Sequence, residues 1–474
     1  APLSRVGLRW RRPISSEAMV LGDHWERSYG DLSWEPPTPG KLLPWSFLAY
    51  DRTQGSTFGM GVRVRPRAFC SWSLDADGVT LWIDVRNGGA PVLLGDRVLE
   101  AATIVTVTGD RPLSVQRGLA AAMCSDPLPS RGPIVGANNW YYAYGVDFGP
   151  SEVLRDAETV VELADGHRVR PYAVVDAGWS LGGVCPGGPW THGIPGLFDD
   201  MQGLARDIAA RGARPGIWMR PAALSYVDDE ARLRPGPRPA KEQPLDLTLP
   251  ENLETIRADV ARLVGWGFEL VKHDFSTFDM FGRWGPAMGA DMTEPGWSYA
   301  DRGLTNAEIL SRLYRIIREG AGDAVVIGCN TVGHLAAGLV DVQRTGDDTS
   351  GREWERTARM GVNTLAFRLA QHGTFFTLDA DCVPCTPQTP WEKNRQFLDL
   401  VARSGTALFV SVDPNARTAR TDADLRAALR LALDGGVRGG VEPLDWLDTP
   451  TPRMWQSGGD VVQYDWSPVA GHGA

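Results

Sequence analysis

Cysteine is scarce in this chain, and several other features are missing altogether. Six cysteines occur in 474 residues, too few for a disulfide framework to hold the fold. No uninterrupted apolar run approaches the roughly 20 residues that a membrane-spanning helix needs. Lysine and arginine form no stripe, and the net charge is −10. We therefore expect neither a nucleic acid nor a membrane as partner.

The closest pair of cysteines, Cys382 and Cys385, forms a Cys-x-x-Cys motif. A second such motif and a histidine pair at ligand spacing are both missing, so we expect no metal site. A local disulfide and two free thiols both stay open, and free thiols are the simpler interpretation. Residues 1–5 carry a charge where a signal peptide would be apolar, which slightly favours a cytoplasmic location. The sequence does not indicate an oligomeric state.

Tryptophan is unusually abundant. The chain has 18 tryptophans, while its 43% apolar and 22% charged residues are ordinary for a globular protein. Indole rings stack on apolar surfaces and keep one N–H for a polar partner. The surplus therefore fits either a sugar-binding cleft or a bulky core.

The patterning divides the chain into three parts. Residues 1–130 show short alternating runs rich in Val, Ile and Thr with Gly and Asp between them, which predicts an antiparallel β domain. Residues 131–415 alternate short apolar runs with helical stretches. Residues 416–474 predict a helix and a short β appendage. A proline-rich stretch near residue 130 resembles a linker.

The middle part contains eight candidate strands separated by amphipathic helical stretches. Eight βα units in roughly 280 residues predict a (β/α)8 TIM barrel. A doubly wound sheet is the alternative, but no Gly-x-Gly-x-x-Gly follows the first strand. The predicted strands are Ile134–Trp140, Tyr172–Asp176, Pro215–Met219, Leu270–Asp274, Val325–Cys329, Val340–Arg344, Thr374–Leu378 and Ala407–Val412. The predicted helices include Met201–Arg211, Leu253–Val264, Ala307–Arg318 and Trp391–Arg403.

Polar and aromatic side chains gather at the carboxyl ends of these strands, where barrel enzymes hold their active sites. A single aspartate there is as well explained by a helix N-cap. A whole set on one rim is not, because burying many charges together is costly unless function requires it. The candidates are Trp140, Asp176, Trp179, Trp218, Lys272, Asp274, Cys329, Asn330, Arg344, Asp347, Asp348 and Asp381.

Two carboxylates at opposing strand ends suit glycoside hydrolysis, in which one attacks the anomeric carbon and the other protonates the leaving oxygen. Lys272 precedes Asp274 by two residues, so both side chains point to the same side of the strand. We expect the Lys272 charge to keep Asp274 ionised. A simple ion pair at the rim is the structural alternative. Two carboxylates suffice for this chemistry, so no cofactor is expected.

The order of strand-end motifs resembles the clan of retaining α-galactosidases, which includes melibiases, α-N-acetylgalactosaminidases and raffinose synthases. The resemblance spans about residues 131–415, and its strength lies in the order of the motifs rather than in any single one. It implies that Asp274 is the nucleophile, Asp348 the general acid/base and Cys329 a residue that faces the sugar. The motifs are Gly136-Ala-Asn-Asn-Trp140, Asp176-Ala-Gly-Trp179, Pro215-Gly-Ile-Trp218, Lys272-His-Asp274, Cys329-Asn330, Arg344-Thr-Gly-Asp-Asp348, Asp379-Ala-Asp381 and Leu408–Asp413.

The departures from this pattern concern the sugar. Ala177 stands where the family has a second aspartate that grips galactose hydroxyls, Ala137 replaces a tryptophan, and Arg220 replaces an acidic residue of some relatives. The segment from His24 to Tyr29, with Trp25 foremost, is expected to supply replacement contacts. Ordinary packing between domains is its structural alternative.

The resemblance predicts a retaining glycoside hydrolase that acts on an oligosaccharide or glycoside with a terminal α-galactoside-like sugar. A transglycosylase using the same site, and a glycosidase for a related sugar such as β-L-arabinopyranoside, are alternatives. A carbohydrate-binding barrel without activity is the alternative from another functional class.

Overall fold

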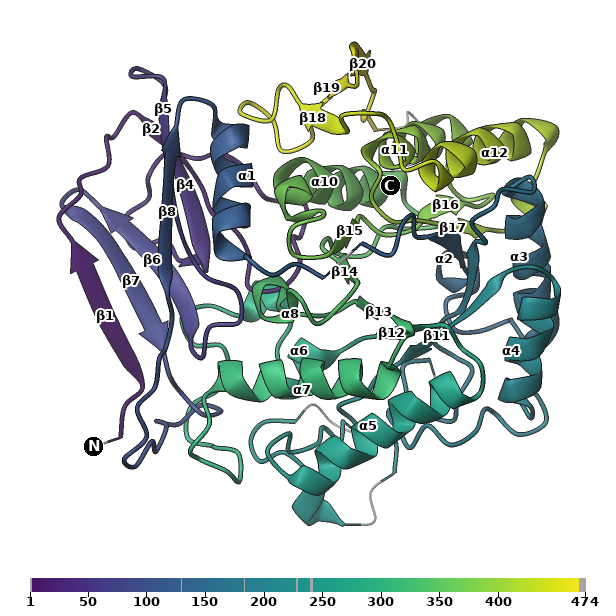
Figure 1. The fold of residues 1–474 in the computed structure, drawn as a ribbon, viewed down its shortest axis with the longest axis horizontal. Coiled ribbons are helices and arrows are strands. Elements are labelled where there is room, and N and C mark those ends of the chain that lie inside the picture. The colour runs from purple at the N-terminus through teal and green to yellow at the C-terminus, as the bar shows by residue number, and fades with distance from the viewer. Residues whose placement is uncertain (1, 129, 183, 227–228, 239–241, 469–474) are drawn as a thin grey trace.

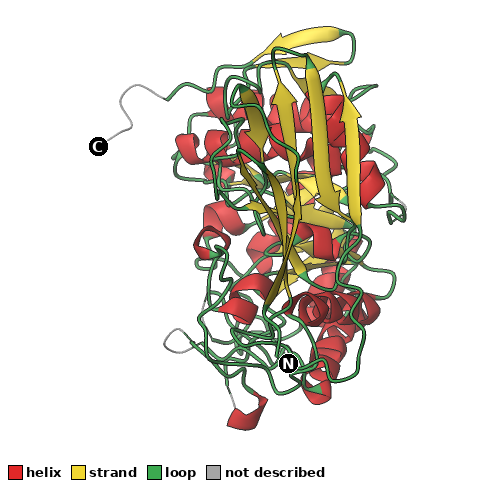
Figure 2. Ribbon diagram, turned by 90° about the vertical axis from the view of Figure 1, so that its left-hand side faces the viewer, coloured by secondary structure: helices red, strands yellow, loops and turns green. Residues whose placement is uncertain are grey.

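The computed structural model describes residues 2–128, 130–182, 184–226, 229–238 and 242–468. An antiparallel β domain stands on one side and a barrel on the other (Figure 1). The β domain has two four-stranded sheets, of order β1-β7-β6-β3 and β2-β4-β5-β8, and it faces the viewer in Figure 2. The strands are β1 (Arg5–Trp10), β2 (Ala18–Leu21), β3 (Leu43–Pro44), β4 (Ser46–Asp51), β5 (Ser56–Val62), β6 (Phe69–Asp75), β7 (Gly78–Asp84) and β8 (Ile104–Gly109).

Aromatic side chains fill the space between these sheets. Phe47 on β4 and Trp72 on β6 are fully buried, with ring centroids 5.7 Å apart. Helix α1 (Pro112–Met123) packs on β5 and β8, and its Leu119 approaches β5 closely where Gly59 has no side chain. Part of the tryptophan surplus therefore belongs to the core.

The second body is the predicted parallel barrel. Its strands run in the order β15-β14-β13-β12-β11-β10-β9-β17-β16, and a parallel bridge between Asp379 and Ala407 closes the ring. The strands are β9 (Val135–Asn138), β10 (Tyr172–Val175), β11 (Arg214–Met219), β12 (Leu270–His273), β13 (Val325–Gly328), β14 (Val342–Arg344), β15 (Thr377–Asp379), β16 (Val383–Cys385) and β17 (Leu408–Val412).

The eight predicted strands are confirmed with small shifts at their ends, and one strand was missed. β16 pairs with β17 alone and continues the seventh barrel strand after a break at residues 380–382. Its Pro384 has no backbone donor, which is tolerated because this part of the strand has a single neighbour. A three-residue run with a central proline does not have the pattern of a strand. All six cysteines are free thiols, Cys382 and Cys385 included.

Helices surround the barrel, and the four predicted ones are confirmed. In the described part of the chain, no helix has the length and apolar character to cross a membrane. The α-helices after α1 are α2 (Trp140–Ala143), α3 (Pro150–Leu163), α4 (Met201–Ala210), α5 (Pro250–Gly265), α6 (Ser276–Phe281), α7 (Asn306–Ala321), α8 (Gly333–Ala336), α9 (Trp354–Thr357), α10 (Asn363–Arg368), α11 (Trp391–Ser404) and α12 (Ala419–Leu433).

A small antiparallel sheet follows the barrel, where a short β appendage was predicted. It has three strands, β18 (Val441–Pro443), β19 (Met454–Ser457) and β20 (Asp460–Gln463), in that order. It lies above α10 and α11 in Figure 1, and Tyr464, just after β20, donates a hydrogen bond to Asp399 of α11.

Candidate active site

A cavity of about 450 Å³ opens at the carboxyl ends of the barrel strands, as a barrel enzyme requires. Nine of the thirteen predicted site residues line it, from the ends of strands β9 to β14 and the loops that follow them. These nine are Trp140, Asp176, Trp218, Lys272, Asp274, Cys329, Arg344, Asp347 and Asp348.

Lys272 lines the cavity, and its ion pair is with Asp176. Its ammonium lies 2.7 Å from Asp176 Oδ2, so the simple ion pair with Asp274, which was the structural alternative, is replaced by one with Asp176. Asp176 is almost fully buried whereas Asp274 is half-buried, so Asp176 needs the counter-charge more. Burial lowers the pKa of Lys272, but the surrounding groups, Asp176 foremost, together raise it above its usual value, so the amine stays protonated. Asn138 Nδ2 also donates to Asp176 Oδ2, at 2.6 Å.

Removing this partner should destabilise the protein. We expect Asp176→Ala to lower the free energy of unfolding by about 3–5 kcal/mol, because the ammonium of Lys272 would stay buried without a counter-charge. Chemical denaturation measures the change. Asp465→Ala is the matched control, because Asp465 also lies 2.7 Å from a lysine, Lys393, but is 52% exposed. That change should cost under about 1 kcal/mol. Equal losses for the two variants would contradict the buried pair's role.

Asp274 follows β12 and is held by two donors. Trp218 Nε1 donates to Oδ2 at 3.2 Å, and the backbone N–H of Phe275 donates to Oδ1 at 2.8 Å. Phe275 has a left-handed backbone, with φ of 64°, a conformation that costs energy in a bulky residue. Arg220 lies over its ring at 4.4 Å and is itself paired with the buried Asp279. The unusual turn therefore fixes the direction of Asp274.

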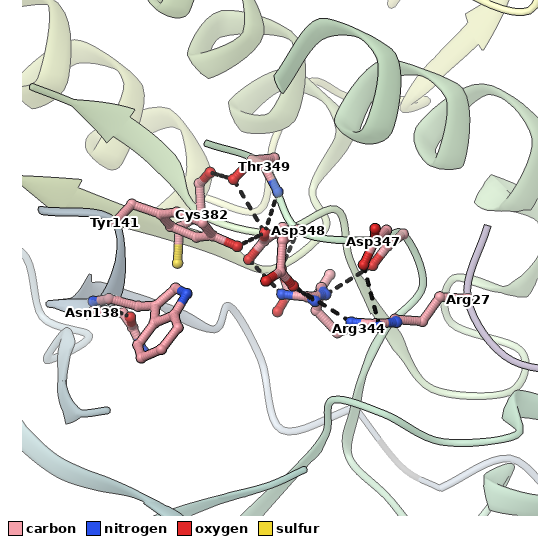
Figure 3. A network of polar contacts seen from close by, with 12 residues as sticks. Arg27, Asn138, Tyr141, Arg344, Asp347, Asp348, Thr349 and Cys382 are labelled. Carbon is pink, nitrogen blue, oxygen red and sulfur yellow. Dashed lines mark hydrogen bonds and ion pairs between the residues drawn. The ribbon is translucent and has the colours of Figure 1, made fainter. Parts of the chain in front are cut away.

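Asp348 is contacted by two guanidinium groups (Figure 3). Arg344 Nη2 donates to its Oδ1, and Arg27 Nη1 donates to the same atom at 3.4 Å. Burial raises the pKa of Asp348, but the charges of Arg344 and Arg27 outweigh it and bring the pKa below its usual range. The carboxylate is 41% exposed to the cavity, so it is both ionised and accessible.

Arg344 is in turn fixed from behind. Its Nη1 lies 2.9 Å from Asp381 Oδ1, and the other oxygen of Asp381 accepts hydrogen bonds from the Tyr141 hydroxyl and from the backbone N–H of Thr349. Asp381 has φ of 77°, so a strained turn points its carboxylate at Arg344. Asp381 thus supports the site from outside the cavity lining.

Three other predicted residues also lie outside the lining. Trp179 is fully buried and donates to Trp218 O at 2.9 Å. Asn330 is buried and donates to Glu26. Trp25 is the clearest correction, because its indole packs edge-on against Phe69 and donates to Gly289 O at 3.2 Å, next to a different cavity. Its large ring is used in the packing between the β domain and the barrel.

The β domain does reach the cavity, through other residues of the same segment. Arg27 and Tyr29 line it. The remaining lining residues were not predicted, apart from Ala177, which was recognised as a departure. Trp284 and Pro286 follow α6, and Cys185 lies in the loop after β10, so irregular loops supply most of what the strand-end pattern missed. In the described ranges, no cluster of three or more His, Cys, Asp and Glu residues is arranged to hold a metal ion.

The chain is similar to solved α-galactosidases over most of its length. A Thermus thermophilus α-galactosidase, solved with p-nitrophenyl α-D-galactopyranoside, is 19% identical with a TM-score of 0.65, and the match covers 98% of this chain and 95% of that one. The same enzyme solved with stachyose gives a TM-score of 0.62 at 19% identity, with 89% and 93% covered.

A GH36 α-galactosidase from Geobacillus stearothermophilus is 13% identical with a TM-score of 0.63, and the match covers 90% of this chain but 62% of that longer chain. No protein-family model and no curated protein matches the sequence. The likeness to these α-galactosidases therefore shows the fold of this chain, a (β/α)8 barrel joined to an N-terminal antiparallel β domain, which is the fold that the sequence predicted.

Proposed function

We propose that this chain is a retaining glycoside hydrolase that removes a terminal α-galactoside-like sugar. The observation that carries the proposal is the pair of accessible carboxylates in one cavity, Asp274 and Asp348, held in different surroundings. Asp274 is fixed by two neutral N–H donors, and Asp348 by two cations. Carboxyls in unlike environments can take the two unlike roles that this reaction needs.

The proposed reaction has two displacements. Asp274 attacks the anomeric carbon, the glycosidic bond breaks, and the leaving oxygen takes a proton from Asp348. Asp348 then removes a proton from water, whose oxygen displaces Asp274 and restores the original configuration. Arg344 and Arg27 favour the ionised form of Asp348, which suits the second step. The first step uses the fraction of the enzyme in which Asp348 holds a proton, so the pH profile depends on these two arginines.

Two neighbouring residues of the cavity, Asp176 and Ala177, bear on which sugar it accepts. Asp176 is held by Lys272 and Asn138, so its carboxylate presents a fixed acceptor at the cavity floor. Its neighbour Ala177, also in the lining, offers no acceptor. An α-D-galactoside is our first choice, on the similarity to α-galactosidases in motifs and fold, and a β-L-arabinopyranoside is the second, because it has the same ring pattern without the exocyclic carbon.

A panel of aryl α-glycosides and the aryl β-L-arabinopyranoside tests the proposal. We expect release of the aryl alcohol from the α-galactoside and initial release of the sugar as the same anomer, which NMR distinguishes. Product analysis with added acceptor sugars separates hydrolysis from transfer. Failure to cleave any member of the panel would favour the carbohydrate-binding barrel instead.

The missing acceptor gives a prediction about specificity. We expect Ala177→Asp to change the ratio of kcat/KM for the aryl α-galactoside over the aryl β-L-arabinopyranoside by about 5- to 150-fold, because one matched hydroxyl is worth about 1–3 kcal/mol. Ala287→Asp is the control, since it adds the same charge on the exposed turn after Pro286 without entering the lining. An unchanged ratio for Ala177→Asp would remove position 177 from the sugar-binding wall.

A further inference from the structure

The β domain is joined by backbone hydrogen bonds to the loop that carries Asp347 and Asp348. Ser28 N donates to Thr345 O at 2.8 Å, and Asp347 N donates to Ser28 O at 2.8 Å, which makes a short parallel bridge. Arg368, at the end of α10, secures the same junction by donating to Glu26 O at 2.7 Å and to Thr345 O at 2.8 Å. A displacement of this segment would therefore displace the loop with the two aspartates.

Arg27 is the side chain that this junction directs into the cavity. Its guanidinium contacts three carboxylates at once, Glu26 at 3.0 Å, Asp347 at 3.2 Å and Asp348 at 3.4 Å. The side chain is 9% exposed, and Figure 3 shows it approaching Asp347 and Asp348 from the side opposite Tyr141. The three contacts use its nitrogens separately, as the planar fork of arginine allows.

Glu26 anchors Arg27 from behind. Its fully buried carboxylate accepts hydrogen bonds from Gly285 N at 3.0 Å and from Asn330 Nδ2. Burial raises the pKa of Glu26, while the charge of Arg27 opposes that rise. Glu26, which holds Arg27, is thus itself fixed by Asn330 after β13 and by Gly285 in the loop after α6. It does not need Asp348 as its only partner.

Asp348 contacts a second cation, Arg27, although Arg344 alone would neutralise its charge. Arg344 already serves that carboxylate and is fixed by Asp381, and two neighbouring guanidinium groups repel one another. The groups that act on Asp348 come from several elements. Arg344 of β14, Arg27 of the β domain and Lys272 of β12 are cationic, while Tyr141 of α2, Asp381 and the adjacent Asp347 contribute a phenol and two carboxyls.

We propose that Arg27 is a positioning residue for Asp348, lent to the barrel by the β domain, and that it controls when this carboxyl holds a proton. The inference rests on the proposed function, in which Asp348 is the acid/base. It also predicts a property of the folded protein that does not depend on turnover.

Replacing Arg27 should change the pH dependence of the reaction. With Arg27→Gln the pKa of Asp348 should rise by about one unit or more, because a contacting opposite charge lowers a carboxyl pKa by about 1–3 units. The limb of kcat/KM due to the general acid then moves to higher pH, measured on a disaccharide α-galactoside that needs protonation. Glu26→Gln should move it to lower pH, because the field of Arg27 on Asp348 is then less neutralised.

Two further variants separate positioning from folding. Arg27→Lys keeps a cation and should largely restore the wild-type limb. Arg356→Gln removes the other arginine of Asp347, whose Nη2 lies 2.8 Å from Asp347 Oδ2, and should leave the limb in place. A purely structural Arg27 would give uniform losses at every pH and no opposite shifts. That result would overturn the inference while the proposed function stood.

A difference titration measures the pKa of Asp348 without any substrate turnover. Proton uptake by the wild type minus that by Asp348→Asn reports the pKa of Asp348, and the same difference is taken in the Arg27→Gln background. We expect the midpoint to rise between the two. A midpoint that does not move overturns the inference even if the wild type cleaves no glycoside, whereas a raised midpoint in an inactive protein supports it and overturns the proposed function alone.

Discussion

Asp274→Ala is expected to reduce turnover of every substrate that the wild type accepts by roughly 10⁵-fold or more, the scale on which the loss of a catalytic nucleophile is felt. Without the carboxylate no glycosyl-enzyme forms, whatever the quality of the leaving group. The donors around it, Trp218 Nε1 and Phe275 N, have no charge to supply in its place. Steady-state hydrolysis of aryl α-galactosides measures the loss, and mass spectrometry of protein treated with a slow, activated fluoro-sugar should detect the covalent adduct in the wild type alone.

Rescue by azide and a control variant at another aspartate test whether the loss comes from the missing nucleophile. Azide can enter the space left in Asp274→Ala and attack from the nucleophile's side, so any restored product should be a glycosyl azide of inverted configuration. Asp413→Ala is the control, because Asp413 also follows a barrel strand but lies outside the cavity lining and accepts from Asn415 N at 2.8 Å. It should keep near-normal activity. Full activity in Asp274→Ala would move the nucleophile to another residue.

The site residues at the strand ends could be predicted, because the sequence pattern locates each strand and the carboxyl end of each strand lies at the barrel mouth. A side chain at the carboxyl end of a parallel barrel strand lies at the mouth whatever its neighbours are. This placed Asp176, Lys272, Asp274 and Arg344 around one cavity from the sequence alone. Asp413 shows the limit of the same reasoning, because it ends a strand too and caps a short 3-10 helix instead.

Pairings within the site could not be predicted, because they depend on burial. The spacing of Lys272 and Asp274 placed both on one side of β12, but the lysine stem is long enough to reach Asp176, at the end of β10. Sequence spacing describes one strand at a time. Which carboxylate receives the ammonium is decided by which one is more completely removed from water.

The contribution of the β domain was predicted for the segment from His24 to Tyr29 with Trp25 foremost, and other residues of that segment line the cavity. Trp25 has the ring that suits a sugar, yet it is buried against Phe69, while Arg27 and Tyr29 reach the cavity. Residues 25–27 form a bend, so the two-residue alternation of a strand does not hold there, and Trp25 and Arg27 face different sides. The bridge at Ser28 fixes which side faces the barrel, and only the structure shows that bridge.

Asp348→Ala should give losses that depend on the leaving group. For a disaccharide α-galactoside we expect kcat/KM to fall by about 10²–10⁴-fold, because its leaving oxygen needs a proton. For a dinitrophenyl glycoside the loss in the first step should be small, since that phenolate leaves without help. Azide should then raise the rate and yield the glycosyl azide of retained configuration, because it replaces the water that Asp348 would activate and attacks the adduct on Asp274.

Asp347→Ala tests whether the general acid/base is Asp348 or the adjacent Asp347. Asp347 lines the same cavity but is held by Arg27 and Arg356, so its loss should lower kcat/KM by similar factors for good and poor leaving groups. If Asp347→Ala instead spares only dinitrophenyl substrates, and Asp348→Ala does not, the acid/base is Asp347. The geometry favours Asp348. Its carboxylate is held at the cavity by Arg344, four residues earlier in the chain. Arg344 is itself paired with Asp381, which accepts a hydrogen bond from Tyr141. A general acid must be placed before it can transfer a proton, and Asp348 is the one that this buried network fixes in place.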